Sequence, residues 1–150
     1  MSTTEQPTTG VLLFIASRSM EERILAAVHA AGYADITLAQ ARIAARIGPN
    51  GTRLTDLAAQ AQVTKQTAGH LVDELAARGY VTRVPDPTDG RARLVTFGPR
   101  GQKVVPVVRA AERAVEAEWT AHLGARRSAQ LRDALARLRE VTDPWYDVDT

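Results

Sequence analysis

The sequence contains no cysteine, and this absence excludes several kinds of chemistry. The chain cannot form a disulfide, a cysteine-ligated zinc or iron–sulfur site, a thiol nucleophile or a thiol redox switch. Its three histidines, His29, His70 and His122, are widely separated and lack the His-Glu-x-x-His spacing of zinc enzymes. We therefore expect no resident metal ion and no cofactor.

Long apolar runs are also missing. The longest run near the N-terminus covers residues 11–16 and is followed by Ser17 and Arg18, so it is too short for a membrane span or a signal-peptide core. We expect a cytoplasmic protein with no membrane partner. Catalytic motifs are absent as well, because the chain has neither a glycine-rich phosphate loop nor a Gly-x-Ser-x-Gly nucleophile elbow. We therefore expect no enzymatic activity.

What the chain does contain fits an ordinary globular domain. Its 150 residues are 45% hydrophobic and 24% charged, which is typical of one compact domain. Of the 19 basic residues 17 are arginine, the side chain whose planar fork suits phosphates and guanine edges. A net charge of +2 permits nucleic-acid binding without requiring it.

Helical spacing of apolar residues dominates the first half of the chain. We expect a flexible tail over residues 1–9 and then a long helix over residues 11–31, ended by Gly32. Three threonines are in position to cap the following helices. Thr37 begins a helix that stops at Gly48, Thr55 begins a short helix that reaches Ala61, and Thr64 begins a helix that reaches about Arg78.

The apolar period changes from about 3.6 to 2 after Gly79. Residues 80–84 and 92–97 alternate and are rich in β-branched side chains, which predicts a β-hairpin with a polar tip at residues 85–91. Gly98 as N-cap and Pro99 at the first helical position predict a long helix to about Leu123 that kinks at Pro106. Ser128 is the expected cap of a last helix, which ends near Val141 and precedes a solvated acidic tail.

A short helix, a tight turn, a second helix and an arginine-bearing hairpin together predict a winged helix-turn-helix. The fold class is thus mainly α with a small β-hairpin wing. On the second helix the residues turned away from the apolar face are those that a major groove would meet, since glutamine pairs with adenine and lysine or histidine donates to guanine or phosphate. These candidate DNA-binding residues are Thr64, Lys65, Gln66, Thr67, Gly69 and His70.

The predicted wing supplies the remaining candidates, Asp89, Arg91 and Arg93. From Arg78 to Arg100 the chain has five arginines and two aspartates, a net charge of +3. Such a hairpin beside a recognition helix suits the minor groove, whose negative potential attracts arginine. Asp89 lies two residues before Arg91 and is placed to orient its guanidinium by a charge-assisted contact.

These residues resemble the MarR (multiple antibiotic resistance regulator) family of bacterial transcription factors. The resemblance rests on the runs at 53–58, 63–67, 71–81 and 85–101, which lie within a segment of about fifty residues. It implies that Asp89 and Arg91 form the Asp-x-Arg motif that places an arginine in the minor groove. In this chain the central position is Gly90, where the family usually has a further cation.

The resemblance implies one MarR-like domain over residues 10–150, with a winged core at about 37–98 and dimerisation helices at about 11–31 and 99–141. It implies a homodimeric repressor that binds a pseudo-palindromic operator in double-stranded DNA and is released by a small aromatic, phenolic or anionic ligand. The apolar stripes of the terminal helices independently favour a dimer, because a second copy would bury them. The residues that would bind the ligand are not predicted.

A second interpretation belongs to another functional class. Winged helices also serve as protein–protein interaction modules that do not bind specific DNA. Asp73 and Glu74 on the predicted recognition helix favour that interpretation, since acidic side chains repel phosphates.

Overall fold

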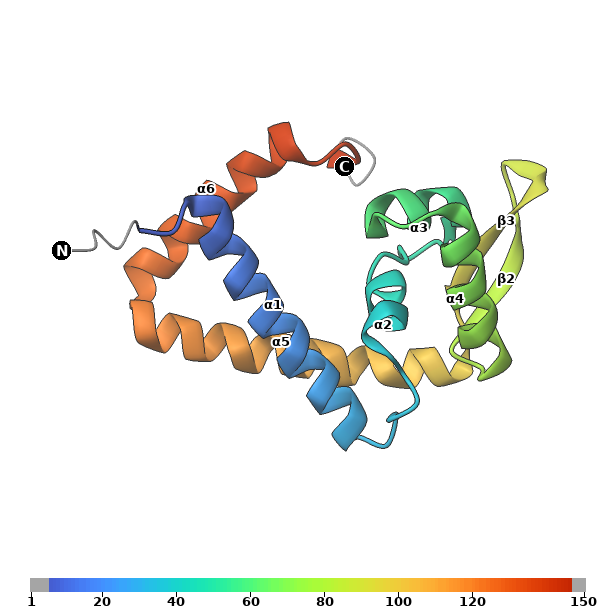
Figure 1. Ribbon diagram of the computed structural model, residues 1–150, viewed down its shortest axis with the longest axis horizontal. Helices are drawn as coiled ribbons and strands as arrows, with labels where there is room; N and C mark the ends of the chain where they lie inside the picture. Colours follow the sequence, from blue (N-terminus) through green and yellow to red (C-terminus); the bar gives the residue numbers. More distant parts are fainter. Residues whose placement is uncertain (1–5, 147–150) are drawn as a thin grey trace. The chain divides into compact units, whose positions relative to one another are not determined.

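A computed structural model describes residues 6–146 of the chain. The chain divides into two compact units, Met1–Ala111 and Glu112–Thr150, and the boundary falls within one long helix. The structure is mainly helical with one small antiparallel sheet, which confirms the predicted fold class (Figure 1). Within residues 6–146, no helix combines the length and the apolar character needed to cross a membrane.

The elements follow the order expected for a winged helix-turn-helix between terminal helices. In chain order they are α1 (Thr9–Ala30), α2 (Leu38–Ala44), β1 (Thr52–Arg53), α3 (Leu54–Ala61), α4 (Lys65–Ala77), β2 (Val81–Asp86), β3 (Asp89–Phe97), α5 (Pro99–Leu123) and α6 (Ala125–Thr142). Helix α5 starts at Pro99, as predicted, and continues through Pro106. The kink at Pro106 stays a prediction.

Helix α1 begins two residues earlier than the sequence pattern indicated. The side chain of Thr8 accepts a hydrogen bond from the Val11 amide at 3.4 Å and so caps the helix. Thr8 and Thr9 therefore do not belong to a flexible tail, and residues 1–5 of that predicted tail lie outside the described residues. Gly32 follows the helix with φ +103°, a conformation that explains why the helix ends there.

The core of the first unit lies where α2, α3 and α4 pack against the sheet. Its most deeply buried side chains come from each of these helices and from the sheet, and include Ile43, Leu57, Val72, Leu75 and Val95. Each comes from an apolar position that repeats with the period of its element. The polar faces of α4 and of the hairpin are left outside this core.

The sheet has three strands in the order β1-β3-β2, all antiparallel, and β1 was not predicted. In β1, Thr52 pairs with Val95 and Arg53 with Leu94. Gly51 precedes this strand with φ +85°, and a Cβ at this position would lie 2.8 Å from the Thr96 side chain. Only glycine satisfies both the backbone and the space at that turn.

Two predicted helix caps were wrong. Thr55 lies inside α3, whose N-cap is Arg53, because strand β1 leads directly into the helix. Ser128 lies inside α6, whose N-cap is Gly124 with φ +83°. In both cases the helix begins before the hydroxyl side chain that was expected to cap it.

The second unit contains the later part of α5 and all of α6. Val115 is buried in it, and Arg132 on α6 donates to Glu116 on α5 at 3.3 Å. After α6, the Asp143 carboxylate accepts from Arg139 at 2.7 Å, so it is tied to the helix and not simply solvated as expected. Residues 147–150 of the acidic tail lie outside the described residues.

Candidate nucleic-acid interface

Helices α3 and α4 form the helix-turn-helix around a very tight connection. Gln62 closes α3 in the left-handed conformation, with φ 55° and ψ 45°. The amide of Val63 then donates to the Ala58 carbonyl at 3.0 Å. Burial of Leu57 and Ala58 on α3 against Ala68 on α4 fixes the crossing of the two helices. The outer face of α4 is therefore held rigidly.

The N-terminal end of α4 is exposed and carries four of the predicted site residues. Thr64 is the N-cap, as predicted, and its hydroxyl oxygen accepts from the Thr67 amide at 3.1 Å. The Thr64 hydroxyl also donates to the Thr67 hydroxyl oxygen at 3.0 Å. Lys65 and Gln66 are exposed, and neither side chain has a partner among the described residues. This end of the helix thus presents a cation, an amide and hydroxyls beside unpaired backbone amides.

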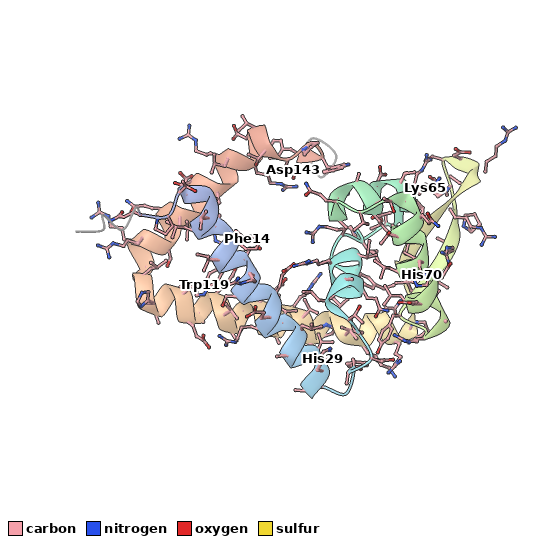
Figure 2. All side chains as sticks on the ribbon, viewed as in Figure 1. Phe14, His29, Lys65, His70, Trp119 and Asp143 are labelled. Atoms are coloured by element: carbon pink, nitrogen blue, oxygen red, sulfur yellow. The ribbon has the colours of Figure 1, made fainter. Side chains whose placement is uncertain are left out.

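Two further predicted residues lie on the next turn of α4, and they differ in orientation. His70 is exposed beyond Lys65 on the same helix (Figure 2). Gly69 is half-buried, and a Cβ built on it would lie 3.7 Å from Leu54 of α3. This direction favours a helix-packing role for Gly69 over the close approach to DNA that the sequence suggested.

The tip of the wing is a tight turn organised by a buried aspartate. Strands β2 and β3 extend to Asp86 and Asp89, so Pro87 and Thr88 form the turn, and a register shift at Pro85 and Asp86 leaves residues 90–92 of β3 without a partner in β2. The Asp86 carboxylate accepts from the Thr88 amide at 2.8 Å and from the Thr88 hydroxyl at 2.7 Å. These bonds hold the tip in one conformation.

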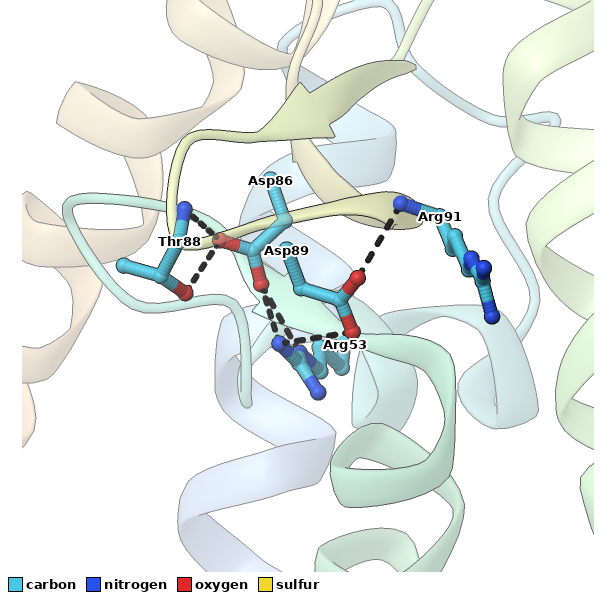
Figure 3. A network of polar contacts seen from close by, with 5 residues as sticks. All are labelled: Arg53, Asp86, Thr88, Asp89 and Arg91. Carbon is cyan, nitrogen blue, oxygen red and sulfur yellow. Dashed lines mark hydrogen bonds and ion pairs between the residues drawn. The ribbon is translucent and has the colours of Figure 1, made fainter.

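Arg53 connects this tip to the helix-turn-helix (Figure 3). Its guanidinium donates to Asp86 through Nε at 2.8 Å and lies 2.6 Å from the same carboxylate through Nη2. The hydrogen bonds from Thr88 and then from Arg53 lower the pKa of Asp86 to about 2. Sequence reasoning missed the pairing of Arg53 with a buried Asp86, because the two residues are 33 positions apart and nothing in the two runs that contain them indicates a contact.

Asp89 has a different task from the one predicted. Its carboxylate accepts from the backbone amide of Arg91 at 3.1 Å, and the Arg91 guanidinium extends away from it (Figure 3). Asp89 therefore orders the backbone at the start of β3 and does not contact the Arg91 guanidinium. Arg91 and Arg93 are exposed, two residues apart on one strand, and neither guanidinium has a partner among the described residues.

The other three arginines near the wing are engaged within the first unit. Arg83 lies 2.6 Å from Asp73 of α4. Arg78 donates to the Asp35 carbonyl at 2.8 Å, and Arg100 donates to the Asp35 carboxylate at 3.0 Å. The cations available to a ligand at the wing are therefore Arg91 and Arg93.

The same network contains Tyr80, which is almost fully buried. Its hydroxyl donates to the Asp35 carboxylate, and the Arg100 guanidinium lies 4.5 Å from its ring centroid. Burial and then this hydrogen bond raise the pKa of Tyr80 to about 12. The bond from Tyr80, followed by that from Arg100, lowers the pKa of Asp35. The network joins the segment before α2 to the start of α5.

Both acidic residues of α4 have partners as well. Asp73 pairs with Arg83, and the Glu74 carboxylate contacts His70 at 2.9 Å and Gln40 at 2.6 Å. Both negative charges are paired within the fold, so these two residues no longer clearly favour a protein–protein interaction module over DNA binding. Among the described residues, no group of three or more histidine and acidic side chains is arranged to hold a metal ion.

Comparison with known proteins identifies the family of this site. Residues 34–92 match the sequence profile described as the MarR family, and they include α2, β1, α3, α4 and the hairpin as far as Ala92. The segment 34–92 is a MarR-family winged helix-turn-helix. Among curated proteins, no sequence matches the chain.

Solved structures extend the MarR likeness to most of the chain. A transcriptional regulator from Thermotoga maritima is 27% identical, with 92% of this chain and 96% of that chain covered and a TM-score of 0.61. Wild-type apo MarR from E. coli is 22% identical, with 89% and 98% covered and a TM-score of 0.70. CouR from Rhodococcus jostii, solved with p-coumaroyl-CoA bound, is 21% identical, with 95% and 97% covered and a TM-score of 0.70. The last two similarities show the fold alone.

Proposed function

We propose that this protein is a DNA-binding transcriptional regulator, a homodimeric repressor that a small aromatic, phenolic or anionic ligand releases from its operator. The observation that carries the proposal is the set of unpaired polar side chains on a MarR-family winged helix. Lys65 and Gln66 are exposed on α4, and Arg91 and Arg93 are exposed on β3. Helix α4 with Thr64, Lys65, Gln66, Thr67 and His70 would enter the major groove, and the arginines of the wing would enter the minor groove.

The test is fluorescence-anisotropy titration against DNA from the protein's own promoter region, at two salt concentrations, with a scrambled fragment as competitor. We expect competitor-resistant binding that weakens steeply as salt rises, because each neutralised phosphate releases a counterion. Arg91→Ala should weaken binding and reduce the salt slope by about 1 for each phosphate contact removed. Arg109→Ala is the matched control, since Arg109 is exposed on α5, outside the helix-turn-helix and the wing.

Equal effects of Arg91→Ala and Arg109→Ala would contradict the assignment of Arg91 to DNA. Binding of the wild-type protein that does not exceed binding to the scrambled fragment would favour the protein-contact function instead. A partner pull-down would then follow.

The proposed dimer is supported by apolar side chains exposed on two helices. On α1, Val11, Leu12, Phe14 and Ile15 are exposed, and Phe14 retains 61% of its accessible surface. On α6 no residue is buried, although Leu131, Leu135 and Leu138 form a stripe with helical spacing. Large apolar surfaces of this kind mark interfaces. A second copy would cover them, and a two-fold dimer would read half-sites about 10 base pairs apart.

Light scattering coupled to gel filtration tests the dimer. We expect Leu135→Asp to give a monomer, because a carboxylate in an apolar interface loses its hydration. Gln130→Asp places the same charge at an exposed polar position of α6 and should remain dimeric. A wild-type monomer at micromolar concentration, or a dimeric Leu135→Asp variant, would contradict this interface.

The proposed ligand site is a cavity of about 430 Å³ between α1, α2 and α3. Its volume is in the usual range for small-molecule sites. Three arginines, Arg18, Arg42 and Arg46, line it together with one carboxylate, Glu21, and the ring of Phe14. Arg42 already holds Glu21 through two hydrogen bonds of 2.9 Å. The surplus of guanidinium groups beside an aromatic ring suits an aromatic anion.

His29 and Trp119 do not belong to this lining. His29 contacts the Ile36 carbonyl through Nε2 at 2.7 Å, and Trp119 belongs to the second unit. Benzoate and p-coumaroyl-CoA are suitable first probes, titrated calorimetrically and then added to the protein–DNA complex. We expect Arg46→Ala to weaken binding of the active probe. If neither probe releases the protein from DNA, the result counts against a ligand of this class.

A further inference from the structure

A chain of three side chains connects the interior of the first unit to the exposed face of α4. Gln40 on α2 is 1% exposed, and its Nε2 donates to Glu74 Oε2 at 2.6 Å. The other carboxylate oxygen, Glu74 Oε1, lies 2.9 Å from Nε2 of His70, one helical turn earlier on α4. The side chain of His70 is 73% exposed, so this series of contacts ends at the surface proposed to meet DNA.

The two hydrogen bonds of Gln40 each have one direction, and they fix which carboxylate oxygen of Glu74 faces His70. Gln40 Oε1 accepts from the Thr37 amide at 3.1 Å, as half of a capping box, so the Gln40 amide cannot turn over without losing that bond. Its NH₂ group therefore faces Glu74. A carboxylate has no proton to donate, so the negative Glu74 Oε1 at 2.9 Å favours the neutral His70 imidazole that carries its proton on Nε2. The remaining nitrogen, Nδ1, is then an acceptor.

We propose that Glu74 is a positioning residue that sets the hydrogen-bonding polarity of His70, and that His70 Nδ1 accepts from a base amino group in the major groove. The amino groups available there are N4 of cytosine and N6 of adenine, whereas guanine presents acceptors only. This inference rests on the proposed DNA-binding function. It assigns Glu74 to base selection, although an acidic residue on a recognition helix would ordinarily repel DNA.

Glu74→Gln is the decisive variant, because it reverses the polarity with little change in shape. Gln40 still offers a donor, so the oxygen of the new amide must face Gln40. The new NH₂ group then faces His70 Nε2 and requires it to accept. A neutral imidazole consequently carries its proton on Nδ1, which becomes a donor suited to O6 or N7 of guanine. Asp73→Asn is the matched control, since it removes the same charge from the neighbouring residue, which pairs with Arg83.

The first measurement needs no DNA. Long-range ¹H–¹⁵N NMR of histidine-labelled protein at about pH 8.5, where imidazoles are neutral, reports which nitrogen carries the proton. The His70→Gln variant lacks the His70 signal, which identifies that signal in the other spectra. We expect the Nε2–H form in the wild type and in Asp73→Asn, and the Nδ1–H form in Glu74→Gln. An Nδ1–H form in the wild type would overturn the proposal whatever the protein binds.

The second measurement is base preference. The wild type first selects a DNA fragment from a random pool. Versions of this fragment with single base-pair changes are then titrated with each of the same four proteins. We expect one position at which the wild type and Asp73→Asn prefer cytosine or adenine by about tenfold. Glu74→Gln should disfavour cytosine there and tolerate guanine, whose O6 and N7 are acceptors, and His70→Gln should lose the wild-type preference. Identical preferences in all four proteins would overturn the role of His70. Failure of the wild type and Asp73→Asn to select any sequence would instead overturn the proposed function, leaving the NMR result to decide the polarity.

Discussion

Arg53 Nη2 lies 2.6 Å from the buried carboxylate of Asp86, and this pair joins the residue that caps α3 to the residue that shapes the tip of the wing. The position of the wing relative to the helix-turn-helix thus depends on one ion pair as well as on the sheet. Because the wing is already ordered in the free protein, its binding to DNA carries a smaller entropy cost.

Arg53→Ala should therefore weaken operator binding although Arg53 itself need not touch DNA. We expect a loss of about tenfold, similar to the loss of one good contact. Amide hydrogen exchange at Thr88 should become faster, because Asp86 loses its partner. Arg53→Lys keeps the charge and should show smaller effects on both. Unchanged exchange at the wing tip in Arg53→Ala would show that the pair does not order the wing.

Acid should loosen the same tip. Asp86 has a pKa of about 2 in the fold against an ordinary value of 3.8, owing to the bonds from Thr88 and Arg53. A depressed pKa adds stability that is fully present above the ordinary value and is lost as the pH falls through the folded value. Thermal unfolding measured from about pH 5 to pH 2 should thus show a falling midpoint in the wild type and a flatter dependence in Asp86→Asn. Parallel curves would exclude Asp86 as the group responsible.

The contact of α5 with the segment that joins α4 to β2 leaves no room for a side chain at Gly101. A Cβ there would lie 2.1 Å from the carbonyl oxygen of Tyr80, a backbone atom that cannot move aside cheaply. We expect Gly101→Ala to destabilise the fold by about 1–3 kcal/mol in urea unfolding. Gly10→Ala is the control, because a Cβ at Gly10 meets nothing within 4 Å and alanine favours the helix by about 0.5–1 kcal/mol. Equal stability of the two variants would contradict the close packing.

Alkaline pH tests the network around Asp35. Tyr80 has a pKa of about 12 against an ordinary 10.0, so its neutral form is favoured by the fold. A raised pKa adds stability that is complete below the ordinary value and is lost as the pH rises through the folded value. Following tyrosinate absorbance, we expect one of the three tyrosines to ionise near 12 and Tyr80→Phe to remove that step. Persistence of the step in Tyr80→Phe would assign it elsewhere.

The parts of this structure that the sequence predicted are those determined by local patterns. Thr64 caps α4, Pro99 starts α5 and the alternation before Phe97 forms a strand, since each depends on residues a few positions apart. Strand β1 has two residues and therefore no period to detect. The bonds of Arg53 to Asp86 and of Gln40 to Glu74 span 33 and 34 positions, so only the folded chain reveals them.

The short length of β1 has a consequence for solubility. Because β1 pairs only with Leu94 and Val95, the segment of β3 from Asp89 to Arg93 has no strand beside it on that side among the described residues, and on the other side only Asp89 and Arg93 are in register with β2. An open strand edge can pair with the same edge of another molecule and start aggregation, and charged side chains prevent this. Arg91 and Arg93 thus protect this open edge of the wing from pairing with another molecule. Replacing both with threonine should make the protein self-associate even where no DNA is present.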